Sequence, residues 1–140
     1  MADTNTLRVR LVTPDRIVFD QTADAIEVPS MAGYIEVLYG HAPLLAELAP
    51  GEVRLHGASE SPNGDRFNVA RGFVEVLPER VTILAESALK PGEINVAEAQ
   101  KELDRGHKLW SEAGDEAEKY EHANEIIREA ESRLQSAKES

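Results

Sequence analysis

The chain changes character at Lys90-Pro91-Gly92. All seven prolines lie at or before Pro91, and Ala, Glu, Lys and Leu dominate the residues that follow. Proline disrupts helices, whereas these four residue types favour them, so the two sides of this point indicate different secondary structure. We therefore expect the 140-residue chain to form two domains, spanning residues 1–88 and 89–140.

The first part has the pattern of short β-strands. Leu7, Val9 and Leu11 alternate with two arginines, and Val53 and Leu55 alternate with polar residues in the same way. Such alternation places apolar side chains on one face of a strand. Turns are predicted at Thr13-Pro14-Asp15, Pro29-Ser30, Ala49-Pro50-Gly51, Ser61-Pro62-Asn63-Gly64 and Leu77-Pro78-Glu79. Many short strands separated by such turns indicate a β-sandwich or barrel.

Two hairpins are predicted within this part. The runs 52–56 and 66–69 flank the longer turn, and the runs 73–77 and 81–84 flank the compact connection Pro78-Glu79-Arg80. Short connections between β-branched runs favour antiparallel pairing.

The second part has helical periodicity. Asn95 is predicted to cap a first helix, and Gly114-Asp115 to end it and cap a second. The expected apolar stripes are Val96, Ala99, Leu103, Gly106 and Trp110 on the first helix, and Ala117, Tyr120, Ala123, Ile127, Ala130, Leu134 and Ala137 on the second. A turn this short requires the helices to lie antiparallel, as an αα-hairpin. Because few residues of the stripes are large, their burial stabilises the pair only weakly, which favours docking or movement.

Composition excludes several classes of function. The chain has 15 basic and 26 acidic residues, a net charge of −11, which repels nucleic acid and anionic lipid head groups. No apolar run approaches the length of a membrane span, and the N-terminus lacks the apolar core of a signal peptide, so we expect a cytosolic chain. The absence of cysteine excludes disulfides, thiolate zinc sites and cysteine nucleophiles.

His41, in the run Gly40-His41-Ala42-Pro43-Leu44-Leu45, is the most suggestive candidate for chemistry. Only Glu36 and Glu47 are near enough in sequence to orient it, and no nucleophile completes a site. The favoured interpretation is that the ring satisfies backbone groups in a loop. Leu44 and Leu45 then either close the sandwich or face a partner. The four histidines show no metal-motif spacing, and no metal site is expected.

An ordered set of segments resembles one family, the epsilon subunit of F-type ATP synthase, from Leu7 to about Leu134. The segments are Val12-Thr13-Pro14-Asp15-Arg16 with Val18-Phe19, Gly40-His41-Ala42-Pro43-Leu44-Leu45, Pro50-Gly51-Glu52-Val53-Arg54, Gly72-Phe73-Val74-Glu75-Val76-Leu77-Pro78, and Val81-Thr82-Ile83-Leu84-Ala85-Glu86. The resemblance implies an N-terminal antiparallel β-sandwich followed by a C-terminal αα-hairpin. It also implies a non-catalytic subunit, peripheral at the cytoplasmic face of the bacterial plasma membrane, that couples ion-driven rotation to ATP synthesis.

The resemblance further implies partners. The sandwich would bind the gamma subunit through His41, Ala42, Pro43, Leu44 and Leu45, and the c-subunit ring through Met31, Ala32, Gly33, Tyr34 and Glu36. Family members commonly have Glu-Gly-Glu-Leu-Gly in the ring-facing stretch, where this chain has Ala32-Gly33-Tyr34-Ile35-Glu36. The ring contact is therefore expected to use Glu36 or aromatic packing by Tyr34. The hairpin would reach the alpha and beta subunits.

Ligand binding and inhibition by the hairpin are expected to be weak. Ile94, Asn95 and Ala99 are the candidate nucleotide positions by resemblance to nucleotide-binding members of the family, in which an aspartate stands at the position of Asn95. Glu98 replaces the arginine that meets phosphate in those members, so no cofactor and no tight ATP binding are expected. From Asn95 onward, seven Lys or Arg stand against twelve Asp or Glu, a net −5 that disfavours docking on an acidic loop of beta. Two rival functions are a free-standing ATP sensor and an enzyme that uses His41 with a glutamate.

Overall fold

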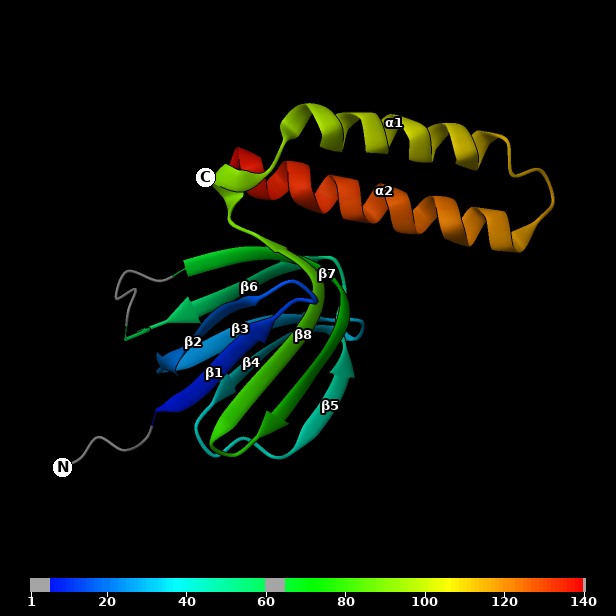
Figure 1. The fold of residues 1–140 in the computed structure, drawn as a ribbon. Helices are drawn as coiled ribbons and strands as arrows, with labels where there is room; N and C mark the ends of the chain where they lie inside the picture. The colour runs from blue at the N-terminus through cyan, green and yellow to red at the C-terminus, as the bar shows by residue number, and fades with distance from the viewer. Residues whose placement is uncertain (1–5, 60–64, 140) are drawn as a thin grey trace. The chain divides into compact units, whose positions relative to one another are not determined.

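The computed structural model describes residues 6–59 and 65–139. The chain forms two compact units, Met1–Ala88 and Leu89–Ser140 (Figure 1). The first unit consists of eight strands: β1 (Leu7–Val12), β2 (Ile17–Ala23), β3 (Ala25–Ser30), β4 (Gly33–Leu38), β5 (Leu44–Glu47), β6 (Gly51–His56), β7 (Asp65–Leu77) and β8 (Arg80–Leu89). The second consists of a 3-10 turn η1 (Pro91–Glu93) and the helices α1 (Val96–Ser111) and α2 (Ala117–Lys138).

Strand neighbours follow the order β2-β1-β8-β7-β6-β3-β4, and β5 pairs with β7. The predicted alternation is confirmed in β1, where Leu7, Val9 and Leu11 are fully buried and the two arginines are exposed. Both predicted hairpins are also present: β6 pairs antiparallel with β7, and β7 neighbours β8. The predicted turn Ser61–Gly64 lies outside the described residues.

The long strand β7 pairs with different strands along its two halves. Its first half pairs with β6, with Gly51 opposite Val69, and its second half pairs with β5, with Leu44 opposite Val76. Between the halves, Arg71 has φ 56° and Gly72 has φ 148°. These positive φ angles interrupt the regular strand, and β7 curves strongly along its length (Figure 1).

The core lies between the two layers. Its largest fully buried side chains come from six strands: Leu7, Val9, Leu11, Ile26, Val28, Val37, Val53, Leu55, Val69, Val74, Val76 and Ile83. Each such side chain contributes about 1.5–3 kcal/mol on leaving water. The predicted sandwich fold is therefore confirmed.

Two local predictions for the sandwich are wrong. β1 and β8 pair in parallel, with Val9 opposite Val81, so the sheet is not wholly antiparallel. These strands lie far apart in the chain and no hairpin sets their direction, while alternation looks the same in either direction. Pro29-Ser30 is not a turn but the end of β3, and the turn follows it. Pro29 and Ser30 pair with the next strand, and a two-residue turn separates the two strands. Turn-prone residue types show that a turn is near but do not fix its exact position.

The αα-hairpin is confirmed, because α1 and α2 pack against each other. Asn95 caps α1 as predicted, because its side-chain oxygen accepts the Glu98 N–H at 3.0 Å. The second cap is wrong by one residue. Glu116 rather than Asp115 precedes α2, and it has no side-chain cap bond.

The predicted apolar stripes are correct only in their middles. Ala99, Gly106, Ala123 and Ala130 are buried, whereas Val96, Trp110 and Ala117 are exposed. The exposed members stand in the first or last turns of their helices. Two buried residues of α2, Ile126 and Ser136, were not predicted.

Gly106 sits in the middle of α1 at a close approach of the two helices. A Cβ atom at this position would lie 2.7 Å from Ile127 Cγ1 and 3.2 Å from the Ile127 backbone nitrogen. The absence of a side chain therefore allows a helix spacing that alanine does not.

Gly106→Ala should destabilise the hairpin by about 1 kcal/mol. Alanine favours an isolated helix by about 1 kcal/mol, but overpacking against Ile127 costs about 1–3 kcal/mol and exceeds that gain. Thermal unfolding followed by the fluorescence of Trp110 measures the difference. His107→Ala, at an exposed neighbouring position, is the control and should leave the melting temperature nearly unchanged. A Gly106→Ala protein that melts at a higher temperature would contradict the close packing.

Candidate partner-binding surfaces

The His41 loop is held by backbone hydrogen bonds. The Gly40 N–H donates to the Pro78 carbonyl at 2.7 Å, and the His41 N–H to the Leu38 carbonyl at 3.1 Å. The ring Nδ1 of His41 lies 2.6 Å from the Ala42 carbonyl oxygen, to which it donates. This confirms the interpretation of His41 as a residue that satisfies backbone groups. Ala42 and Pro43 beside it are exposed.

Leu44 and Leu45 begin β5, the short strand that pairs with the second half of β7. Leu45 is 69% exposed and lies opposite Glu75, on the outer face of the sandwich. The alternative that Leu45 closes the sandwich is therefore wrong. Leu44 is partly covered, with 38% exposed.

Leu45 is one of four apolar residues on the outer face of neighbouring strands, which we call the outer stripe: Val12 of β1, Leu84 of β8, Phe73 of β7 and Leu45 of β5. Val12 pairs directly with Leu84. Phe73 and Leu84 are 53% and 54% exposed, although both are large apolar side chains. An exposed row of this kind is typical of a protein-binding surface.

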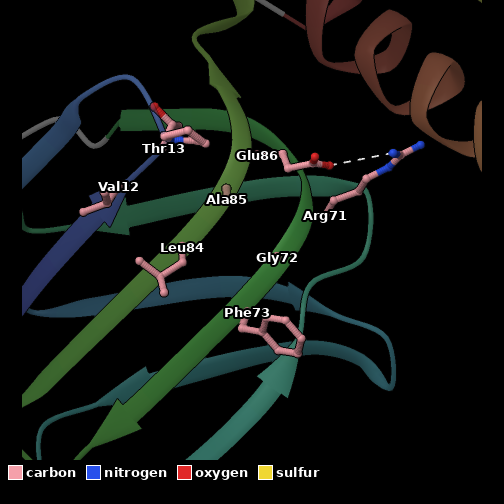
Figure 2. Close-up of a pocket in the computed structure, with 9 residues that line it drawn as sticks. Val12, Thr13, Arg71, Gly72, Phe73, Leu84, Ala85 and Glu86 are labelled. Carbon is pink, nitrogen blue, oxygen red and sulfur yellow. Dashed lines mark ion pairs between the residues drawn. The ribbon is translucent and has the colours of Figure 1, made fainter.

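Three members of the outer stripe, Val12, Phe73 and Leu84, line a shallow groove of about 470 Å³, shown in Figure 2. Its lining residues are Val12, Thr13, Pro14, Arg71, Gly72, Phe73, Leu84, Ala85 and Glu86. At one end, the Arg71 guanidinium lies 3.7 Å from the Glu86 carboxylate, and both side chains are exposed. The groove is thus mostly apolar, with an ion pair at its rim.

Sequence reasoning missed Val12, Phe73 and Leu84 as candidate contact residues. The run Ile83-Leu84-Ala85 could have indicated this surface, because it places apolar residues on both faces of the strand. A strand with one face in solvent usually alternates apolar and polar residues instead. Strand pairing decides which outward-facing side chains become neighbours, and the sequence of a single strand does not show its pairing.

The candidate ring-facing residues surround the β3–β4 turn. Met31, Ala32, Gly33 and Glu36 are all exposed. The turn is nevertheless fixed, because the Met31 N–H donates to the Glu47 carbonyl at 2.9 Å. The structure therefore brings these candidates together on a well-held loop.

Tyr34 is half-exposed but anchored. Its hydroxyl accepts the Glu52 N–H at 2.9 Å, and the Arg54 guanidinium lies 5.6 Å from its ring centre. Gly51 makes room for it, because a Cβ there would lie 2.7 Å from the hydroxyl. The anchored ring leaves one face of Tyr34 for a partner.

An ionic cluster surrounds this anchor. The buried Glu52 carboxylate lies 3.0 Å from Arg54 and 2.9 Å from Arg66. Burial lowers the pKa of Arg54, but its hydrogen bond and ion pair with Glu52 outweigh burial and raise that pKa. Glu27 lies 3.7 Å from Arg54 and stands opposite Glu36 in the strand register. The Arg54 charge is therefore shared between two carboxylates.

The three candidate nucleotide positions serve local structure. Ile94 and Ala99 are buried, and the Asn95 side-chain oxygen is occupied by the α1 cap. Nucleotide binding at these residues stays a prediction. Among residues 6–59 and 65–139, no group of three or more His, Asp or Glu side chains is arranged to hold a metal ion. In the same part of the chain, no helix combines the length and apolar content of a membrane span.

Comparison with known proteins agrees with this fold. Residues 6–91 match the family model for the ATP synthase Delta/Epsilon chain beta-sandwich domain. An ATP synthase epsilon chain from Koribacter versatilis is 41% identical over 116 residues, covering 83% of this chain and 78% of that protein. The chain belongs to the ATP synthase epsilon chain family. The predicted family and subunit are thereby confirmed.

Further relatives of this epsilon chain span almost its whole length. The chloroplastic epsilon chain of Pyropia yezoensis is 38% identical over 132 residues, covering 94% of this chain and 96% of that protein. A chain in the Euglena gracilis mitochondrial ATP synthase structure, described as OSCP/F1/c-ring in rotational state 1, has a TM-score of 0.77 at 24% identity. It covers 95% of this chain and 81% of its own, which supports the fold of the epsilon chain.

Proposed function

We propose that this epsilon chain is a non-catalytic central-stalk subunit that couples rotation of the c-subunit ring to ATP synthesis through the gamma subunit. The outer stripe carries this proposal, because it exposes Leu45, Phe73 and Leu84 on one face of the sandwich. Exposure of large apolar side chains to water raises the free energy of the protein, and burial of these side chains against a partner lowers it. The family membership makes gamma the expected partner.

The gamma contact is proposed to include the His41 loop. Ala42 and Pro43 are exposed beside the protruding Leu45, while His41 orients the loop through its bond to Ala42. His41 is assigned a structural role, because its Nδ1 bonds to a backbone carbonyl of its own loop. The rival enzyme function is not favoured, because the sequence offers no nucleophile beside His41.

The ring contact is proposed to lie at the β3–β4 turn, with Met31 and the free face of Tyr34 as apolar contacts and Glu36 as the charged one. Anchoring of Tyr34 by Glu52 reduces the entropy lost when the turn meets a partner. Membrane association is proposed to be peripheral, at the cytoplasmic face of the bacterial plasma membrane and through the assembled complex. The hairpin is proposed to face the alpha and beta subunits.

Purification with a gamma subunit from the same source tests the coupling role. The two chains, mixed at micromolar concentration and separated by size, should elute as a one-to-one complex. Separate elution under gentle conditions would overturn the proposal. The rival ATP-sensor function predicts submillimolar binding of Mg-ATP to the isolated chain in calorimetry, whereas coupling without nucleotide binding predicts no such heat.

Removal of residues 91–140 should change the ATPase activity of the assembled enzyme by less than about twofold, because the net −5 of the hairpin disfavours docking on an acidic loop. Steady-state hydrolysis by complexes reconstituted with the full and shortened chains measures this. A severalfold rise would show that the hairpin inhibits despite its charge. Equal incorporation of both chains, determined from the purified complexes, is the control.

A further inference from the structure

The net negative charge of the helical hairpin comes entirely from its tip. Residues 112–125 contain six acidic residues and one lysine, a net −5 that equals the net charge of the whole segment 95–140. The flanking residues 95–111 and 126–140 each contain three acidic and three basic residues and are neutral overall. The acidic residues of the tip are Glu112, Asp115, Glu116, Glu118, Glu121 and Glu125.

A groove of about 350 Å³ opens at the same tip, between the end of α1 and the start of α2. Its lining residues are Leu109, Glu112, Glu118, Lys119 and His122, and most of its surface is apolar because side-chain carbons form the walls. Two carboxylates thus stand on the lining of an apolar groove. This combination accepts an apolar side chain flanked by positive charge.

The tip lysine does little to offset the acidic residues. The Lys119 ammonium lies 2.7 Å from the Glu116 carboxylate, and this hydrogen bond and ion pair raise the pKa of Lys119. Its charge is therefore directed to a neighbour on the same helix turn. The electrostatic potential around the groove therefore stays negative.

A half-exposed aromatic residue stands at the same tip, in the last turn of α1. Trp110 follows Leu109 in the chain, is about half exposed, and meets the Tyr120 ring edge-on with centres 5.3 Å apart. The face of an exposed indole attracts lysine and arginine side chains. Trp110 is also the single tryptophan of the chain and therefore reports on binding at the tip.

We propose that the hairpin tip, formed by Leu109, Trp110 and the acidic residues of 112–125, is a docking site for a basic amphipathic helical segment of a protein partner. One apolar side chain of the partner enters the groove over Leu109, and lysine or arginine side chains meet Glu112 and Glu118. Charge complementarity selects this partner, since phosphate backbones and anionic lipids are repelled. The site shares no residue with the outer stripe.

A synthetic peptide tests the site on the full chain. The probe is a helical peptide of about 14 residues, four helical turns, built from lysine and leucine, and its matched control replaces every lysine with glutamate. The lysine peptide should change Trp110 fluorescence saturably, with affinity in the micromolar range that weakens about tenfold between about 50 and 300 mM salt. The glutamate peptide should have no effect. Lack of saturation with the lysine peptide would overturn the proposal.

Variants separate a defined site from general attraction to an acidic protein. Glu112→Gln with Glu118→Gln should weaken binding about tenfold, whereas Glu98→Gln with Glu102→Gln, the same charge change near the start of α1, should stay within about twofold. Leu109→Ala should weaken binding about fivefold without altering the salt dependence, because it removes apolar contact only. Equal losses in both glutamine pairs, or an unaffected Leu109→Ala protein, would refute the groove. Circular dichroism of each variant verifies that the helices persist.

Discussion

Phe73→Glu should weaken binding of the gamma subunit by about 30- to 100-fold. Phe73 stands on β7, which lies between β5 and β8, lines the groove together with Leu84, and is 53% exposed in the isolated chain. Central aromatic residues dominate interface energies, with losses of about 2–3 kcal/mol on truncation, and a glutamate adds the cost of burying an unpaired charge. Titration of labelled gamma with each variant measures the change in affinity.

Val96→Glu is the matched control for this prediction. Val96 is equally exposed at 53% but lies at the first position of α1, outside the outer stripe. A glutamate in the first turn of a helix is compatible with the helix dipole, so folding should be preserved. This variant should bind gamma like the parent. If Phe73→Glu binds gamma with parental affinity, the outer stripe is not the gamma contact.

Leu45 and Leu44 give a graded comparison within the same surface. Leu45→Ala removes a side chain that is 69% exposed, and Leu44→Ala one that is partly covered. The first should weaken gamma binding with little change in stability, and the second should affect both. The two exposed fractions therefore assign gamma contact to Leu45 and both gamma contact and packing to Leu44, a difference that the sequence of two adjacent leucines does not show.

Gly72→Ala should destabilise the sandwich by about 3 kcal/mol or more, at the upper end of overpacking effects. Gly72 has φ 148°, and a Cβ at this position would overlap the Leu84 carbonyl oxygen and lie 3.0 Å from Ala85 Cα. These are backbone atoms of β8, so relief requires β7 and β8 to separate. Such a loss corresponds to a melting temperature lower by more than about 10 °C for a domain of this size.

Hydrogen exchange of the β7 and β8 amides measures this effect without interference from the helices. Faster exchange throughout both strands is expected in Gly72→Ala. Gly92→Ala is the control, because it has an ordinary φ and no heavy atom within 4 Å of the added carbon. An exchange pattern in Gly72→Ala that matches the control would refute the tight approach of β7 and β8. Gly72→Ala should also distort the groove beside the outer stripe, because Gly72 is one of its lining residues.

Local features of this epsilon chain could be predicted from its sequence because each depends on residues close together in the chain. The change of composition at Lys90-Pro91-Gly92 separates strands from helices, and Asn95 caps α1 through a residue three positions away. His41 was interpreted correctly because its ring bonds to the next residue. In each case the deciding interaction is short-range.

Other features were decided only by tertiary structure. Alternation in β1 and β8 shows which side chains are buried, but not that these strands pair in parallel and set Val12 beside Leu84. The outer stripe consequently crosses strands that are remote in sequence. Gly72 and Gly106 are needed where backbone or side chains from another element approach closely.

The physical reason for this division is that periodicity records the environment of a side chain and not the identity of its neighbours. Residue types in the sequence determined two units, their strands and helices, and the family resemblance of their motifs. Long-range pairing and packing decided which outward side chains meet. The outer stripe and the hairpin tip belong to this second group, because the first joins residues from different strands and the second joins residues from both helices.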